Sequence, residues 1–189
     1  GAIWGVNADN IGYVRLGTSE NAAGTEWRQV TPKDFAHCIS VGGPYANVWM
    51  VVLAGRISQR GFRGEDDLVG SAWQHRRGRL DDISVGDSWN VWGVNEDEDI
   101  FRFNIDQSEW EQIGGKLVHI SVGGNGEVWG VNEDGDIYRR LGISVHNQAG
   151  TEWERISGNL VRISVGSDGI VFGINKDDDI YVRRGISSA

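Results

Sequence analysis

The chain has 189 residues, of which 39% are hydrophobic, so it can form a core without disulfides or a structural metal. Its formal net charge is −9, which repels phosphate and argues against nucleic acid as a partner. No apolar run has the length of a membrane span, so no membrane insertion is expected. The chain opens without a signal sequence, and we expect the mature form of an extracellular, secreted protein. Cys38 is the single cysteine, so no intrachain disulfide can form, and a homo-oligomer remains open.

A sequence repeat begins at the first residues and returns four times. Its leading aromatic residue is followed by Gly-Val-Asn or a variant, and the copies lie 45, 43, 37 and 43 residues apart. A second anchor is a tryptophan before a polar pair, and a third is the tetrapeptide Ile-Ser-Val-Gly. Both keep the same register as the first anchor. The three sets begin at Trp4, Trp49, Trp92, Trp129 and Phe172; at Trp27, Trp73, Trp110 and Trp153; and at Ile39, Ile83, Ile120 and Ile163.

Each repeat predicts four β-strands, seen most clearly in the fourth copy. Apolar and polar residues alternate there over 117–123, 127–132, 136–140 and 151–156, which is typical of strands. Asp134-Gly135 predicts a type I′ turn between the second and third of these strands. A four-stranded meander repeated about every 40 to 45 residues predicts an all-β fold, a β-propeller of four-stranded antiparallel blades. Eight of the nine tryptophans occupy the two repeated positions, and we expect them to fill the gaps between blades.

The first and last repeats are incomplete. The chain enters at the second strand of the first repeat and stops after the third strand of the last. We expect one propeller domain over residues 1–189, five-bladed with one thin blade; the alternatives are a sequence that is itself incomplete, or a six-bladed ring with one blade absent. Since an open ring exposes strand edges, closure by some route is expected.

The pattern Val-Trp-Gly-Val-Asn, acidic turn, Ile-Tyr-Arg-Arg, Gly-Thr-Glu-Trp and Leu-x-x-Ile-Ser-Val-Gly resembles the tectonin repeat over nearly the whole chain. The resemblance implies a non-enzymatic lectin of innate defence, similar to the fish-egg lectins. Such lectins bind N-acetylglucosamine-type sugars and bacterial surface polysaccharide such as lipopolysaccharide. Larger relatives use the repeat as a protein-interaction scaffold, which is the alternative function. The second copy departs from the pattern, with Val52, Ala54 and Arg56 in place of the acidic turn.

Carbohydrate contact is predicted on the face formed by the turns after the first and third strands. The long loops 17–26, 61–72 and 142–152 belong to this face. Trp89 and Tyr45 fall there without repeat counterparts and can stack on a sugar ring. The neighbouring residues predicted to bind hydroxyls are Asp87, Ser88 and Asn90. The alternative is that Trp89 covers a neighbouring blade or a second chain.

The acidic turns have the alternate-residue spacing that begins a calcium loop, but the rest of that loop is missing. Turn chemistry is therefore favoured over a metal, and no cofactor is expected, with calcium as the alternative. The candidate metal ligands are Asp97, Asp99, Asp134, Asp136, Asp177 and Asp179.

An arginine recurs at the end of the third strand in four of the five copies. A structural ion pair between blades is the favoured interpretation, and a grip on an anionic glycan is the alternative. The candidates for glycan contact are Arg15, Arg140 and Arg183. The four histidines hold no metal-ligand spacing, and no catalytic sequence motif occurs, so no enzyme is expected.

Overall fold

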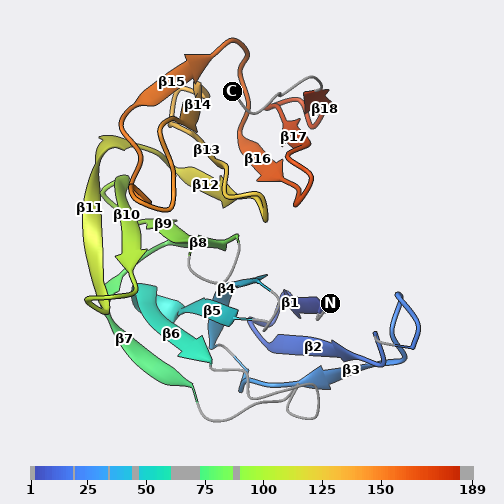
Figure 1. Ribbon diagram of the computed structural model, residues 1–189. Helices are drawn as coiled ribbons and strands as arrows, with labels where there is room; N and C mark the ends of the chain where they lie inside the picture. The colour runs from blue at the N-terminus through green and yellow to red at the C-terminus, as the bar shows by residue number, and fades with distance from the viewer. Residues whose placement is uncertain are drawn as a thin grey trace.

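The computed structural model describes residues 3–18, 20–33, 35–43, 47–60, 73–86 and 90–183. Within these ranges the protein is all-β, with five antiparallel sheets arranged radially as the blades of a propeller (Figure 1). The only helical turn in them is the short 3₁₀ segment η1, Leu53–Gly55. No helix in the described part has the length and apolar character needed to cross a membrane. The predicted fold class is confirmed.

Each blade is a meander whose strands pair in sequence order. Blades two, three and four have four strands, whereas blades one and five have three. Blade one is β1 (Ile3–Val6), β2 (Gly12–Leu16) and β3 (Glu26–Gln29); blade two is β4 (Ala36–Gly42), β5 (Asn47–Val52), β6 (Arg56–Arg60) and β7 (Gln74–Arg79); blade three is β8 (Asp82–Val85), β9 (Val91–Val94), β10 (Asp99–Asn104) and β11 (Glu109–Lys116). Blade four is β12 (His119–Val122), β13 (Val128–Val131), β14 (Ile137–Arg140) and β15 (Trp153–Ile156); blade five is β16 (Arg162–Val165), β17 (Val171–Ile174) and β18 (Ile180–Arg183).

The serine of the Ile-Ser-Val-Gly repeat joins the first strands of neighbouring blades. The hydroxyl of Ser40 accepts a hydrogen bond from the Val85 amide at 2.9 Å. Ser84 does the same for Val122 at 2.9 Å, and Ser121 for Val165 at 3.0 Å. Since these side chains satisfy backbone donors of the adjacent sheet, the repeated serine fixes the height of one blade against the next.

The hydrophobic core lies in layers between blades. The second-strand tryptophans Trp49, Trp92 and Trp129 are fully buried, each in a cluster with apolar residues of the following blade. This confirms their predicted role between blades. Trp27 is the exception, with 50% of its surface exposed, because no described blade packs against its side of blade one.

The turn between β13 and β14 differs from the type I′ turn that was predicted at Asp134-Gly135. The Gly135 amide donates to the Asn132 carbonyl at 3.0 Å, and the Asn132 amide donates to the Asp136 carbonyl at 3.1 Å. Gly135 has a positive φ of 80°, whereas Asp134 does not. A type I′ turn requires positive φ at both residues, so that prediction is wrong. Three residues connect the strands, which gives a type I turn followed by a left-handed residue.

The sheets of blades one and five do not pair with each other through any strand of the described chain (Figure 1). Strand β1 pairs with β2, and β18 pairs with β17. The expected closure of the ring is therefore not made by backbone pairing within the described residues.

Candidate functional site

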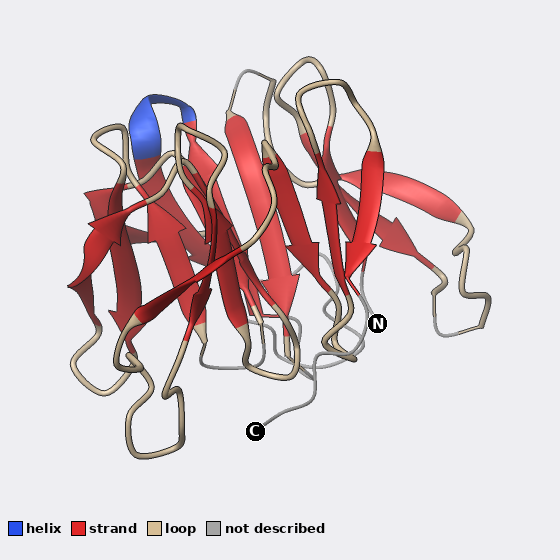
Figure 2. Cartoon of the chain, turned by 90° about the horizontal axis from the view of Figure 1, so that it is seen from above, coloured by secondary structure: helices blue, strands red, loops and turns tan. Residues whose placement is uncertain are grey.

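The loops gather at the two ends of the strands and form two faces (Figure 2). The turns after the first and third strands make the first face. Two long loops of this face, 17–25 between β2 and β3 and 142–152 between β14 and β15, have matching internal contacts. The Thr25 amide donates to the Leu16 carbonyl at 2.8 Å, and the Thr151 amide donates to the Leu141 carbonyl at the same distance.

Arg15 and Arg140 stabilise these two loops. Each guanidinium lies over the tryptophan of the adjacent fourth strand, 5.4 Å from the Trp27 ring centroid and 5.2 Å from that of Trp153. Each Nε also donates at 2.8 Å to a loop carbonyl, of Ala23 or Ala149. Burial lowers the pKa of Arg140. Neither arginine takes part in an ion pair with a described residue. For Arg15 and Arg140 the predicted ion pair between blades is therefore wrong, since the partner of each is an indole of the same blade.

The residues predicted to stack on sugar, Trp89 and Tyr45, lie outside the described residues, as do Asp87 and Ser88. Asn90 is described and half-buried. Its Oδ1 accepts a hydrogen bond from Trp92 Nε1 at 2.6 Å, and its Nδ2 donates to the Gly126 carbonyl at 3.2 Å. Both ends of the amide therefore position the blade, and a role for Asn90 in sugar binding remains a prediction.

The acidic turns use their side chains within the protein. Asn95 and Asn132 accept hydrogen bonds from the amides of Asp99 and Asp136 at 2.8 and 2.7 Å. Asp99 pairs with Lys116 at 2.9 Å, a contact that lowers the pKa of the Asp99 carboxyl.

Asp136 likewise pairs with Arg155, and the Asn175 side chain accepts from the Asp179 amide at 2.9 Å. Asp97, Asp134 and Asp177 point to solvent. The described residues contain no group of three His, Cys, Asp or Glu side chains able to hold a metal. These contacts account for the repeated Asn and Asp through turn geometry.

The inner strands of blades two to five line a cavity of about 410 Å³. His119 lies there with Nε2 3.7 Å from a carboxylate oxygen of Asp82. Burial is the main cause that lowers the pKa of His119; Arg162 lowers it further, and Asp82 opposes the shift. Cys38 belongs to β4, the inner strand of blade two, where burial raises the pKa of its thiol to about 12 and Asp82 adds to the effect.

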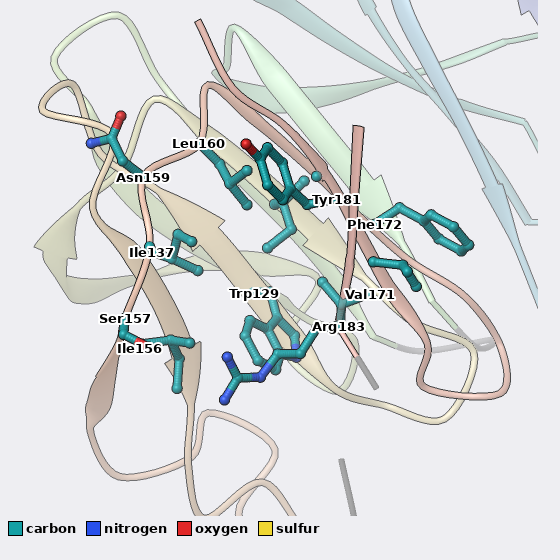
Figure 3. A pocket seen from close by; sticks show the side chains of 14 residues that line it. Trp129, Ile137, Ile156, Ser157, Asn159, Leu160, Val171, Phe172, Tyr181 and Arg183 are labelled. Carbon is teal, nitrogen blue, oxygen red and sulfur yellow. The ribbon is translucent and has the colours of Figure 1, made fainter. Parts of the chain in front are cut away.

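A second cavity, of about 420 Å³, lies between blades four and five (Figure 3). Trp129, Gly158, Leu160, Phe172 and Arg183 are among the residues that line it. Our sequence reasoning missed this site, although it named Arg183 as a glycan contact. The sequence does contain a signal for this site, the repeated glycine. Gly78, Gly115 and Gly158 recur 37 and 43 residues apart, in register with the other repeated residues.

The family model described as Tectonin domain matches residues 1–189. A search among curated proteins finds no match. Among solved structures, the WD40 β-propeller domain of Doa1 is similar with a TM-score of 0.63 at 11% identity, over 96% of this chain and 60% of that one. A structure described as YCF48 bound to D1 peptide is similar with a TM-score of 0.59 at 16% identity, over 95% of this chain and 60% of that one. The chain thus spans about three fifths of each, and likeness at these identities concerns the fold alone.

Proposed function

The chain belongs to the Tectonin domain family, and on that premise we propose that it is a carbohydrate-binding lectin without catalytic activity. Its ligands in this proposal are N-acetylglucosamine-type sugars or the lipopolysaccharide glycans of bacterial surfaces. The setting is extracellular, in innate defence. Binding uses side chains alone, without a metal or another cofactor.

The observation that carries this proposal is the pair of matched loops on the first face. Loops 17–25 and 142–152 lie on blades one and four and share the arginine–indole stack, the arginine bond to a loop carbonyl and the threonine bond to a leucine carbonyl. A loop held by such contacts loses little conformational entropy when it binds a ligand. The first face therefore carries two loops whose ends are held by the same contacts.

The tip of the second loop is exposed and mostly polar. In the second loop Ser144, His146 and Asn147 are exposed to solvent, and Val145 has 84% of its surface exposed. Hydroxyl, imidazole and amide groups are suitable partners for sugar hydroxyls. The turn between β8 and β9, where the sequence carries Trp89, belongs to the same face by strand connectivity, and an aromatic ring there adds a stacking surface.

Shallow sites of this kind bind single sugars weakly. Several of them on one rigid ring can engage a surface that repeats its sugars, because the second contact forms at a high effective concentration. The proposal therefore expects binding that rises steeply with glycan density on an immobilised surface.

A glycan array at two glycan densities, followed by competition with free N-acetylglucosamine, tests the proposal. We expect retention on N-acetylglucosamine-containing glycans, release by the free sugar and no effect of a metal chelator. Replacing Trp89→Ala should weaken binding by about tenfold, the loss of one stacking contact. Tyr181→Ala, which removes an exposed ring from strand β18, is the matched control and should bind as the unaltered chain does. Absence of retention on every glycan at both densities would contradict the proposal.

A protein-interaction ring is the second candidate function, and one observation favours it. Blade five exposes a run of large apolar side chains, Phe172, Ile180, Tyr181 and Val182. Phe172 is opposite Val182 in the sheet, so these two and Ile180 lie on one face of the blade, and exposed apolar side chains gathered on one face are typical of a site for a protein partner. A chain that ignores all glycans but binds a polypeptide at blade five would establish this alternative.

A further inference from the structure

The innermost strands of four consecutive blades form the wall of the central cavity. Strands β4, β8, β12 and β16 lie near the middle of the ring, and each contacts the next (Figure 1). Most of the residues that line the cavity of about 410 Å³ belong to these four strands. The wall is thus built within blades two to five and does not depend on how blades one and five are joined.

The repeated serine leaves a hydroxyl proton without a partner in this cavity. Ser40, Ser84 and Ser121 line the cavity, and the oxygen of each accepts a hydrogen bond from an amide of the next blade. A serine hydroxyl also carries one proton that it can donate. None of these three hydroxyls donates its proton to a described residue. Three hydroxyl donors are therefore available to a ligand.

The residue two positions before that serine differs from blade to blade. Side chains two apart in a strand lie on the same face of the sheet, so this residue and the serine share one face. Three of these variable residues line the cavity, namely Asp82, His119 and Arg162. One carboxylate oxygen of Asp82 accepts from the Ile83 amide at 2.9 Å, and the other accepts from the Ile120 amide at 3.2 Å. Both oxygens of the acidic group are thus already hydrogen-bonded.

The two basic groups of the cavity have no such partners. The Arg162 side chain is exposed and makes no hydrogen bond or ion pair with a described residue. His119 Nδ1 is buried without a hydrogen-bond partner in the described chain. Its Nε2 lies 3.7 Å from the Asp82 carboxylate, beyond hydrogen-bond distance. The polar side chains left unpaired can all donate a proton, whereas the carboxylate that could accept one is occupied.

We propose that the central cavity binds one small oxyanion, a phosphate or a carboxylate, through the guanidinium of Arg162, the imidazole of His119 and the serine hydroxyls. The planar guanidinium can donate to two oxygens of one anion at once. The charges of Arg162 and Asp82 balance, so the lining has no excess negative charge to repel the anion, although the chain as a whole is acidic. None of these residues belongs to the first-face loops, so the site is independent of the glycan proposal.

Isothermal titration calorimetry of the full chain tests the site, with ionic strength held constant by sodium chloride. The probes are inorganic phosphate, acetate and, as a neutral polyol, glycerol. We expect saturable binding of at least one oxyanion at a single site and none of glycerol, because a polyol does not use the charge of Arg162. The tighter of the two oxyanions identifies the class of ligand.

Two arginine variants locate the binding. Arg162→Gln removes an exposed side chain without a hydrogen bond in the described chain, so it should leave the fold intact and weaken oxyanion binding by at least about tenfold. Arg77→Gln removes the same charge from an exposed position on the outer strand β7 and is the matched control, which should bind as the unaltered chain does.

The imidazole of His119 provides a second readout, followed by nuclear magnetic resonance as the pH is varied. Asp82 and Arg162 face this imidazole with or without the ligand, so the bound anion is the one added charge. It should raise the pKa of His119, because a nearby negative charge favours the imidazolium. No binding of either oxyanion, equal binding of glycerol, equal losses in both arginine variants, or a His119 pKa that the bound anion leaves unchanged would each overturn the proposal.

Discussion

The interface between blades three and four and the one between blades four and five are built from the same parts, yet only the first is complete. In both, a buried second-strand tryptophan faces a positive-φ glycine of the same blade. Trp153 closes the first interface, whereas the second holds a cavity. Trp129 nevertheless remains buried, in a cluster with Leu160, Ile163 and Val171.

This difference shows that the space beside the positive-φ glycine keeps its shape without a described tryptophan in it. The glycine conformation and the apolar residues of the next blade position its walls. The comparison also separates Trp92, which is covered by the tryptophan of the next blade, from Trp129, which borders a cavity.

The largest expected effect compares the two buried second-strand tryptophans, Trp92 and Trp129. Trp92→Ala should lower the free energy of unfolding by about 3 to 5 kcal/mol, because it leaves a large cavity under Trp153. Trp129→Ala should cost about 1 to 2 kcal/mol less, since Trp129 already borders a cavity and loses fewer contacts. Urea unfolding of both variants measures the difference. Equal losses would mean that the interface between blades four and five is as tightly packed as the one between blades three and four.

The next effect compares two fourth-strand tryptophans. Trp153→Ala should lower the unfolding free energy by about 2 to 4 kcal/mol, because the ring packs on Trp92 and Gly115. Trp27→Ala should cost about 1 kcal/mol or less, because half of that side chain is exposed and its main contact is the Arg15 stack. Thermal melting of the two variants gives the ranking, and a larger loss for Trp27→Ala would show that its face is covered in solution.

A smaller effect separates the two arginines. Arg140→Ala should lower stability by about 1 kcal/mol through loss of the indole stack and of the bond to Ala149. Arg183→Ala should leave the stability of the chain unchanged, because among the described residues no indole lies beneath its guanidinium. Thermal melting of the two variants measures the difference. A stability loss shared by both variants would place Arg183 in a structural contact of its own.

The smallest effect is a pH dependence from the inner strands. Burial holds the pKa of His119 below its ordinary value of 6.5, so the unfolded chain binds a proton more readily than the folded chain. Stability should therefore decrease as the pH falls below 6.5 and towards the folded pKa. His119→Gln should flatten this part of the curve, measured by urea unfolding between pH 7.5 and about pH 5. Asp82 and Arg162 face the imidazole, so a steeper decrease in the variant would assign the dependence to that pair.

Much of the fold was predictable because three sets of residues repeat along the sequence in the same register. Trp92, Trp129 and the Ile-Ser-Val-Gly serines recur at fixed spacing, and each position has one structural role wherever a neighbouring blade is present. The turn at Asp134-Gly135 was predicted as type I′, which connects two strands by two residues. The prediction was wrong because an Asp-Gly dipeptide does not reveal how many residues connect the strands, and here there are three.

The candidate site was less predictable, because exposure depends on neighbours that a repeat pattern does not include. Trp27 and Trp153 have equivalent sequence positions, yet one is half exposed and the other is packed between blades. Arg15 and Arg140 looked suited to an ion pair in an acidic chain, but the nearest groups in the folded blade are indole rings. The role of Gly78 and Gly115 was overlooked, since it appears only when the tryptophan of the next blade is placed against each glycine.

The most direct test of the comparison is urea unfolding of Trp92→Ala and Trp129→Ala side by side with a crystal structure of each variant. The account predicts a larger loss of stability for Trp92→Ala, together with a new cavity beneath Trp153. A larger loss for Trp129→Ala, or a Trp129 ring in the unaltered chain that fills the cavity between blades four and five, would contradict it.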